Sequence, residues 1–189
     1  MATTIGVLSL LEGPARQEAL RLWQLFETEY DSRGVQTFAH PHLTFHAGTC
    51  LDVSELEVAL TKLCQEFHPF EVLIDRLGYF DEPTPVIFMR VVPTPQLLAL
   101  HRQIGEFMGF HCVGLYEHYL PDRWVPHVTL AMGDLTPANF ERAWRDLRGL
   151  RPQFRQVLSN MHLVRRDDET GLVEIVASYA CKGPEAGAG

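Results

Sequence analysis

The sequence of 189 residues has no long hydrophobic run. None of its apolar stretches approaches the roughly 20 residues that a membrane-spanning helix requires, which argues against a membrane partner. The first residues, MATTIGVLSLLEG, also lack the basic leader and long apolar core of a secretory signal peptide. We therefore expect a cytoplasmic protein that does not bind a membrane.

Cysteine is scarce, and its spacing indicates no metal site. The four cysteines, Cys50, Cys64, Cys112 and Cys181, form neither a CxxC motif nor another ligand-like pattern. Each lies within or beside an apolar segment. We expect four reduced thiols, as is usual for a cytoplasmic protein.

An excess of positive charge is also missing. Lys and Arg number 16 against 24 Asp and Glu, which gives a formal net charge of −8. A protein that grips duplex DNA needs many cationic contacts to phosphates, so this balance argues against duplex DNA as a partner. One locally positive pocket on an acidic protein can still bind a small phosphate-bearing ligand.

The sequence does contain enough apolar residues for a folded core. They make up 46% of the chain, which suits one domain or two small fused lobes. Apolar residues recur with the period of a strand in some segments and of a helix in others, so the two element types should alternate. Strands are predicted at 3–11, 42–48, 70–80, 85–92, 127–132, 154–164 and 171–180, and helices beginning near residues 14, 53, 95 and 137.

The order of these elements is repeated along the chain. Each half contains a helix, a strand with a His-x-Thr motif, a second helix and two strands. His42 precedes His127 by 85 positions, and the helix start at Val53 precedes that at Pro137 by 84. The sequence therefore predicts an α+β protein with two similar lobes related by pseudo-twofold symmetry. Each lobe is an antiparallel sheet backed by helices, and the active-site groove lies between the lobes. We place a single domain at 1–182, with lobes at about 1–92 and 93–182, and a flexible tail at 183–189.

The repeated motif places an imidazole beside a hydroxyl in each lobe. Side chains i and i+2 of a strand point to the same face, so His42 and Thr44 share one face, as do His127 and Thr129. An imidazole titrates near pH 6.5, so one histidine can accept a proton while the other donates one. This arrangement suits acid–base chemistry at phosphorus without a metal, with the threonine hydroxyls holding the phosphate.

With HLTF at 42–45 and HVTL at 127–130, the chain resembles the 2H phosphoesterases. This group includes the 2′,5′-RNA ligase-like proteins and the cyclic nucleotide phosphodiesterases, and the resemblance extends to the element order over residues 3 to about 180. It implies metal-independent cleavage or formation of phosphodiester bonds, with no nucleotide cofactor. The reactions implied are the opening of 2′,3′-cyclic phosphates to 2′-phosphates and chemistry at 2′,5′ linkages.

From these motifs we predict the roles of four residues. His42 and His127 carry the proton transfers, and Thr44 and Thr129 hold the phosphate of a nucleotide or RNA-end substrate. Which histidine is the base stays open, because substrate orientation decides it in a nearly symmetric site. We expect the protein to act as a monomer.

The segment YEHYLPDRWVPH at 116–127 holds candidate substrate contacts, because loops beside active sites often carry specificity residues. Tyr119 or Trp124 can stack on a base, and Arg123 can pair with a phosphate. The alternative is that Trp124 packs in the core and that Arg123 is solvated.

The remaining histidines leave a metal-dependent hydrolase as an alternative. His40 and His46 flank His42 at i−2 and i+2, so strand periodicity places all three on one face. The second half has Val125 and Ala131 at the matching places, and we therefore interpret His40 and His46 as groove-rim or surface residues. A further alternative is a module that binds nucleotides or RNA ends in the groove without turnover. Four histidines without a partner in the other half are predicted to be structural or surface residues: His68, His101, His111 and His162.

Overall fold

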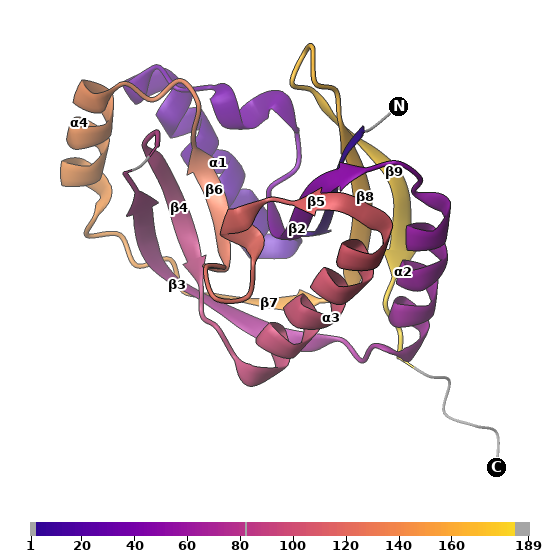
Figure 1. Ribbon diagram of the computed structural model, residues 1–189. Coiled ribbons are helices and arrows are strands. Elements are labelled where there is room, and N and C mark those ends of the chain that lie inside the picture. Colours follow the sequence, from indigo (N-terminus) through magenta and orange to yellow (C-terminus); the bar gives the residue numbers. More distant parts are fainter. Residues whose placement is uncertain (1–2, 82, 184–189) are drawn as a thin grey trace.

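The computed structural model describes residues 3–81 and 83–183, so the predicted tail lies outside the described residues beyond Gly183. It contains two antiparallel sheets, one with strand order β5-β2-β1-β8-β9 and one with order β6-β4-β3-β7 (Figure 1). This confirms the predicted α+β fold. The first sheet consists of β1 Thr3–Leu10, β2 His42–Cys50, β5 Cys112–Leu115, β8 Asn160–Arg166 and β9 Val173–Ala180. The second consists of β3 Phe70–Phe80, β4 Val86–Val91, β6 His127–Ala131 and β7 Phe154–Leu158.

Four α-helices cover the sheets in the described part of the chain, and none of them is long and apolar enough to cross a membrane. Two begin where the sequence predicts, because the hydroxyl oxygens of Thr94 and Thr136 accept hydrogen bonds from the backbone N–H groups of Leu97 and Asn139, both at 3.2 Å. A proline in the first turn favours each of these starts. The helices are α1 Gly13–Tyr30, α2 Ser54–Glu66, α3 Pro95–His111 and α4 Pro137–Leu147.

Two of the helices pack against the sheet to which the strand directly before them does not belong. α1 connects β1 to β2 of the first sheet, but it packs with α4 beside β6 and β7 of the second. In the same way, α3 follows β4 of the second sheet, but it packs with α2 beside β2 of the first sheet and beside β5, the strand that comes after it. This packing joins the two sheets. It also places α1 behind the His-x-Thr strand β6 and α3 behind the His-x-Thr strand β2.

The sheets do not coincide with the predicted lobes at 1–92 and 93–182. β3 and β4 lie in the first half of the chain but share a sheet with β6 and β7, whereas β8 and β9 complete the sheet of β1 and β2. The strand predicted at 154–164 is also wrong as a single element, because β7 pairs with β3 and β8 pairs with β1. The chain crosses from one sheet to the other at Ser159, within a segment whose pattern is that of one continuous strand.

The expectation of four reduced thiols is wrong for one pair of cysteines. The short strand β5, which the sequence pattern did not predict, pairs with the end of β2 and brings the Cα atoms of Cys50 and Cys112 to 4.0 Å, where a disulfide joins them. Cys64 and Cys181 are buried free thiols whose Sγ atoms lie 2.9 Å apart. The cysteines therefore do not support the expected reducing compartment.

Candidate active site

The two His-x-Thr strands share a backbone irregularity. The pairing of β1 with β2 skips Phe45, and the pairing of β4 with β6 skips Leu130. Each skipped residue follows directly after the motif threonine, Thr44 or Thr129, and forms a β-bulge. The strands that carry the motifs therefore have the same local geometry in both sheets.

Up to the bulges, the side chains alternate as predicted. The motif histidines and threonines, His42, Thr44, His127 and Thr129, all line one pocket. The apolar motif residues, Leu43, Phe45, Val128 and Leu130, are buried in the core. The core packing of the apolar residues thus holds the polar ones toward the pocket.

His46 lies on the opposite face from the predicted one. Because the bulge shifts the alternation by one position, His46 is fully buried and Ala47 lines the pocket in its place. The His46 ring stacks on that of His101 with centroids 4.2 Å apart, and its Nε2 donates a hydrogen bond to the His101 carbonyl oxygen at 3.2 Å. His40, His42 and His46 therefore do not converge as metal ligands, and the prediction that His46 is a rim or surface residue is wrong.

Each motif histidine is oriented by a carbonyl oxygen two residues before it. The Nδ1 of His42 donates to the carbonyl of His40 at 2.7 Å, and the Nδ1 of His127 donates to that of Val125 at 2.6 Å. A carbonyl oxygen only accepts, so each Nδ1 carries a proton and Nε2 is unprotonated in the neutral ring. Nε2 is therefore the atom of each ring that can exchange a proton with a bound molecule.

A tryptophan indole fixes the backbone of each motif threonine. The Nε1 of Trp23 in α1 donates to the carbonyl oxygen of Thr129 at 3.0 Å, and the Nε1 of Trp124 donates to that of Thr44 at 3.1 Å. Both rings are buried, and Trp124 stacks on His101 with ring centroids 3.9 Å apart. Trp124 does not line the pocket, so the alternative in which it packs in the core is confirmed.

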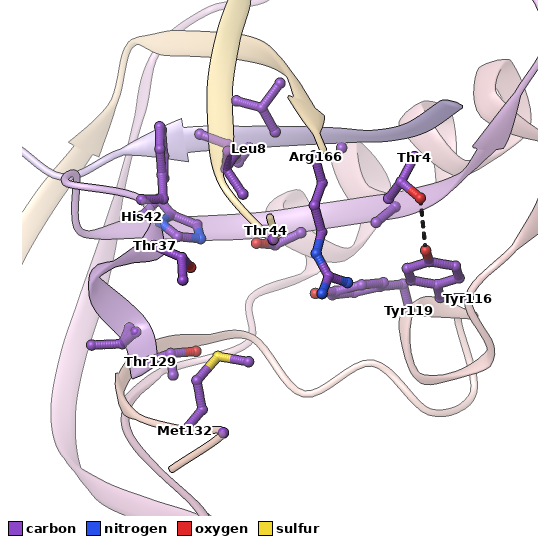
Figure 2. A pocket seen from close by; sticks show the side chains of 18 of the residues that line it. Thr4, Leu8, Thr37, His42, Thr44, Tyr116, Tyr119, Thr129, Met132 and Arg166 are labelled. Carbon is purple, nitrogen blue, oxygen red and sulfur yellow. Dashed lines mark hydrogen bonds between the residues drawn. The ribbon is translucent and has the colours of Figure 1, made fainter. Parts of the chain in front are cut away.

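The motif side chains open into a pocket of about 470 Å³ between the two sheets (Figure 2). His42 and Thr44 come from the first sheet, and His127 and Thr129 come from the second. Figure 2 places Thr44 and Thr129 on opposite sides of this space. The 3-10 helices η1 (Gly34–Thr37) and η2 (Glu117–Tyr119) provide further parts of the wall.

Burial weakens the proton affinity of both motif histidines. It is the largest cause that lowers the pKa of His42 to about 4, and the neighbouring His127 lowers this pKa further. Burial also lowers the pKa of His127 below its usual value. An imidazolium loses hydration in such a pocket, so both rings are neutral at pH 7 unless an anion is bound. A bound phosphate favours the protonated form of a ring beside it.

The other two predicted contacts differ in position. Tyr119 of η2 lines the pocket. Burial raises the pKa of its hydroxyl, and a hydrogen bond with the Thr44 side chain partly lowers this pKa again. Arg123 is exposed, does not line the pocket and forms an ion pair with Glu117 at 2.7 Å. Its position therefore matches the solvated alternative.

The sequence pattern did not identify Tyr116 and Arg166 as pocket residues, although both line the pocket. Arg166 stands at the end of β8, just beyond the strand predicted at 154–164. Only the pairing of β8 with β1 brings it into the sheet of the motif strand β2, from which β1 separates it. Trp23 lies in the helix predicted to begin near residue 14, but its contact with Thr129 depends on the packing of α1 against the second sheet.

The fold and the pocket define a two-sheet α+β protein in which each sheet contributes one His-x-Thr strand to a shared site. A family model of the 2′-5′ RNA ligase superfamily matches residues 13–170. The chain belongs to this family, and thereby to the 2H phosphoesterases.

Two bacterial proteins that both carry the name "Putative phosphoesterase" are similar to part of the chain. The one from Oceanobacillus iheyensis is 30% identical over 105 residues, which are 54% of this chain and 56% of that protein. The one from Bacillus licheniformis is 32% identical over 96 residues, which are 48% of this chain and 52% of that protein. The chain thus spans about half the length of these relatives.

Solved structures resemble the whole fold. TT0787 of Thermus thermophilus has a TM-score of 0.63 at 18% identity, over 95% of this chain and 98% of that one. E. coli LigT in complex with 3′-AMP has a TM-score of 0.65 at 15% identity, also over 95% and 98%. At these identities the likeness establishes the fold.

Proposed function

We propose that the protein is a metal-independent phosphoesterase that acts on RNA-derived or nucleotide phosphodiesters. The observation that carries this proposal is the matched setting of the two motifs at one pocket. Each motif has the same bulge, the same contact from Nδ1 to a carbonyl and the same indole contact to the threonine. Such a setting suits a reaction at phosphorus in which a proton moves at both ends.

The proposed hydrolysis opens a 2′,3′-cyclic phosphate. Thr44 and Thr129 donate hydrogen bonds to the non-bridging oxygens of the phosphate. The unprotonated Nε2 of one motif histidine takes a proton from water as the water oxygen bonds to phosphorus. The other histidine, protonated at Nε2 beside the bound phosphate, gives its proton to the departing 3′ oxygen, which leaves a 2′-phosphate. The near symmetry of the site permits either ring to be the base, and the orientation of the bound ribose decides.

The same groups suit reaction at a 2′,5′ linkage. With a 5′ hydroxyl in the place of water, the same two proton transfers join RNA ends, and their reverse cleaves the linkage. All four motif side chains come from one chain, so we propose that the monomer is the active unit. The solved complexes of E. coli LigT with 3′-AMP, phosphate and ATP support a nucleotide as the substrate here.

The test is incubation of the protein with adenosine 2′,3′-cyclic phosphate, with and without EDTA, followed by phosphorus NMR. We expect a 2′-phosphate product at the same rate in both samples. Turnover that stops in EDTA would contradict the metal-independent mechanism. Saturable binding without a product would instead assign a nucleotide-binding module.

A further inference from the structure

We propose that the pocket contains a second anion site, formed by Arg166, that binds a phosphate other than the reacting one. This inference rests on the function proposed above and narrows its substrate class. The favoured substrates would be nucleotides or RNA ends in which a second phosphate, such as a 5′-phosphate or the next phosphodiester of the strand, accompanies the reacting group.

Arg166 is the one Arg or Lys among the described residues that line the pocket. It ends β8 and pairs with Thr4 of β1, and its guanidinium points into the pocket beside Tyr119 (Figure 2). Within the described ranges, the guanidinium forms no ion pair. A guanidinium presents several donors in a fork that matches phosphate oxygens, so one that faces a pocket without a carboxylate partner suits an external anion.

The two carboxylates that follow Arg166 in the sequence are engaged with other groups. Asp167 accepts hydrogen bonds from backbone N–H groups of the turn that follows it. Asp168 accepts a hydrogen bond from the hydroxyl of Thr4 at 3.0 Å, and the Tyr116 hydroxyl lies 3.2 Å from the same Thr4 oxygen. Because the single hydroxyl proton of Thr4 goes to Asp168, Tyr116 is the donor in the second contact. Both carboxylates thus have other hydrogen-bond partners, and neither forms an ion pair with the Arg166 guanidinium.

The neighbouring Arg165 has the opposite arrangement. It forms an ion pair with Glu174 of β9 and does not line the pocket. Successive side chains of a strand point to opposite faces, which explains why adjacent arginines have such different surroundings. Arg165 therefore provides a control with the same charge on the same strand.

The floor between the motif and Arg166 is formed by small residues. Gly6 of β1 and Ala47 of β2 pair with each other, and both line the pocket. β2, β1 and β8 are successive strands at a spacing of about 4.8 Å, so the backbone of Arg166 lies roughly 10 Å across the sheet from β2. It also lies opposite Thr4, which pairs with Thr49, so it is displaced along the strand from Thr44 by several residues at about 3.3 Å each. One phosphate cannot occupy both ends of this space, whereas a nucleoside with a phosphate at each end can. A volume of about 470 Å³ lies within the usual range for small-molecule sites.

The experiment compares two nucleotides that differ by one phosphate and need no turnover. Dissociation constants of adenosine 3′-phosphate and adenosine 3′,5′-bisphosphate are measured by isothermal titration calorimetry for the wild type, Arg166→Gln and Arg165→Gln. We expect the wild type to bind the bisphosphate at least about tenfold more tightly, as a charge-assisted contact provides. Arg166→Gln should bring the ratio of the two constants close to one, and Arg165→Gln should keep it.

The outcomes separate this inference from the proposed function. Equal affinity of the wild type for the two nucleotides would overturn the second anion site alone. An equal loss of preference in both variants would also overturn it, because the effect would then reflect net charge. A wild type that binds neither nucleotide would overturn the inference and the nucleotide substrate on which it rests.

Discussion

His42 and His127 are the residues on which the proposed reaction depends most directly. General acid–base catalysis by one side chain contributes about 10²- to 10⁴-fold, so replacing either histidine with alanine should reduce turnover by about 10²-fold or more. Both residues line the pocket rather than the core, so the fold should persist, as judged by circular dichroism. Initial rates with adenosine 2′,3′-cyclic phosphate provide the measurement.

The matched control for these variants is His162→Ala. His162 lies on β8 outside the pocket, and its Nδ1 contacts the Ser178 hydroxyl at 2.9 Å. Its loss should leave turnover within a few-fold of the wild type. An activity loss below about tenfold in both His42→Ala and His127→Ala would count against the assigned roles.

The pKa values of the same two histidines predict an acidic optimum. The base must be neutral and the acid protonated, and burial holds the pKa of His42 at about 4 and that of His127 below its usual value. The kcat/KM profile reports the free protein. It should therefore fall as the pH falls through about 4, because the base becomes protonated, and it should reach its maximum below about pH 6.5. Bound phosphate favours the imidazolium form, so the kcat profile should lie at higher pH. Rates measured from about pH 4 to pH 9 test this, and a kcat/KM maximum above about pH 7 would contradict it.

At the scale of elements, α3 supports the first motif strand through close packing on His46. A β-carbon at Gly105 would lie 2.6 Å from Nε2 of His46, whose ring is buried and stacked on His101. Gly105→Ala should therefore destabilise the protein by about 1–3 kcal/mol, because the ring has no room to move. Urea denaturation measures the change.

Gly109 of the same helix is the control for this prediction. A β-carbon there meets nothing within 4 Å, so Gly109→Ala should stabilise the protein by about 0.5–1 kcal/mol through helix propensity. If the two variants have the same stability, the close contact between α3 and His46 does not constrain the fold. The His46 ring stacks on His101, whose Nε2 contacts the carbonyl oxygen of the pocket residue Tyr119 at 2.9 Å. A displaced His46 should therefore shift this pocket wall, and Gly105→Ala should in addition weaken nucleotide binding.

Strand periodicity predicted the face to which the motif side chains point, but not the bulge that interrupts the alternation directly after each motif. Alternation correctly placed His42 and Thr44 toward one pocket, since the apolar residues between and after them require burial. It failed at His46, because a bulge adds one residue without any change in the local composition. The indole of Trp124 was ambiguous for a similar reason: its ring suits a base or the core, and only the packing of α3 decides.

At the scale of the whole molecule, the sequence indicated the number of layers but not the path of the chain between them. The repeated element order correctly predicted two antiparallel sheets backed by helices. Which strands share a sheet depends on long-range pairing, and the crossing at Ser159 falls within an apolar segment that continues on both sides. Arg166 could not be connected with the motif from the sequence for the same reason, because its place in the pocket follows from the pairing of β8 with β1.

The disulfide between Cys50 and Cys112 is a further long-range tie, and its presence can be counted. In protein prepared without reductant and then denatured, two thiols per chain should react with a thiol reagent, namely those of Cys64 and Cys181, whereas all four should react after reduction. The bond closes a loop with a sequence separation of 62, so it restricts the unfolded chain and reduction should lower the free energy of unfolding by about 2–4 kcal/mol. Four reactive thiols before reduction would show that β5 is held to β2 by backbone pairing alone.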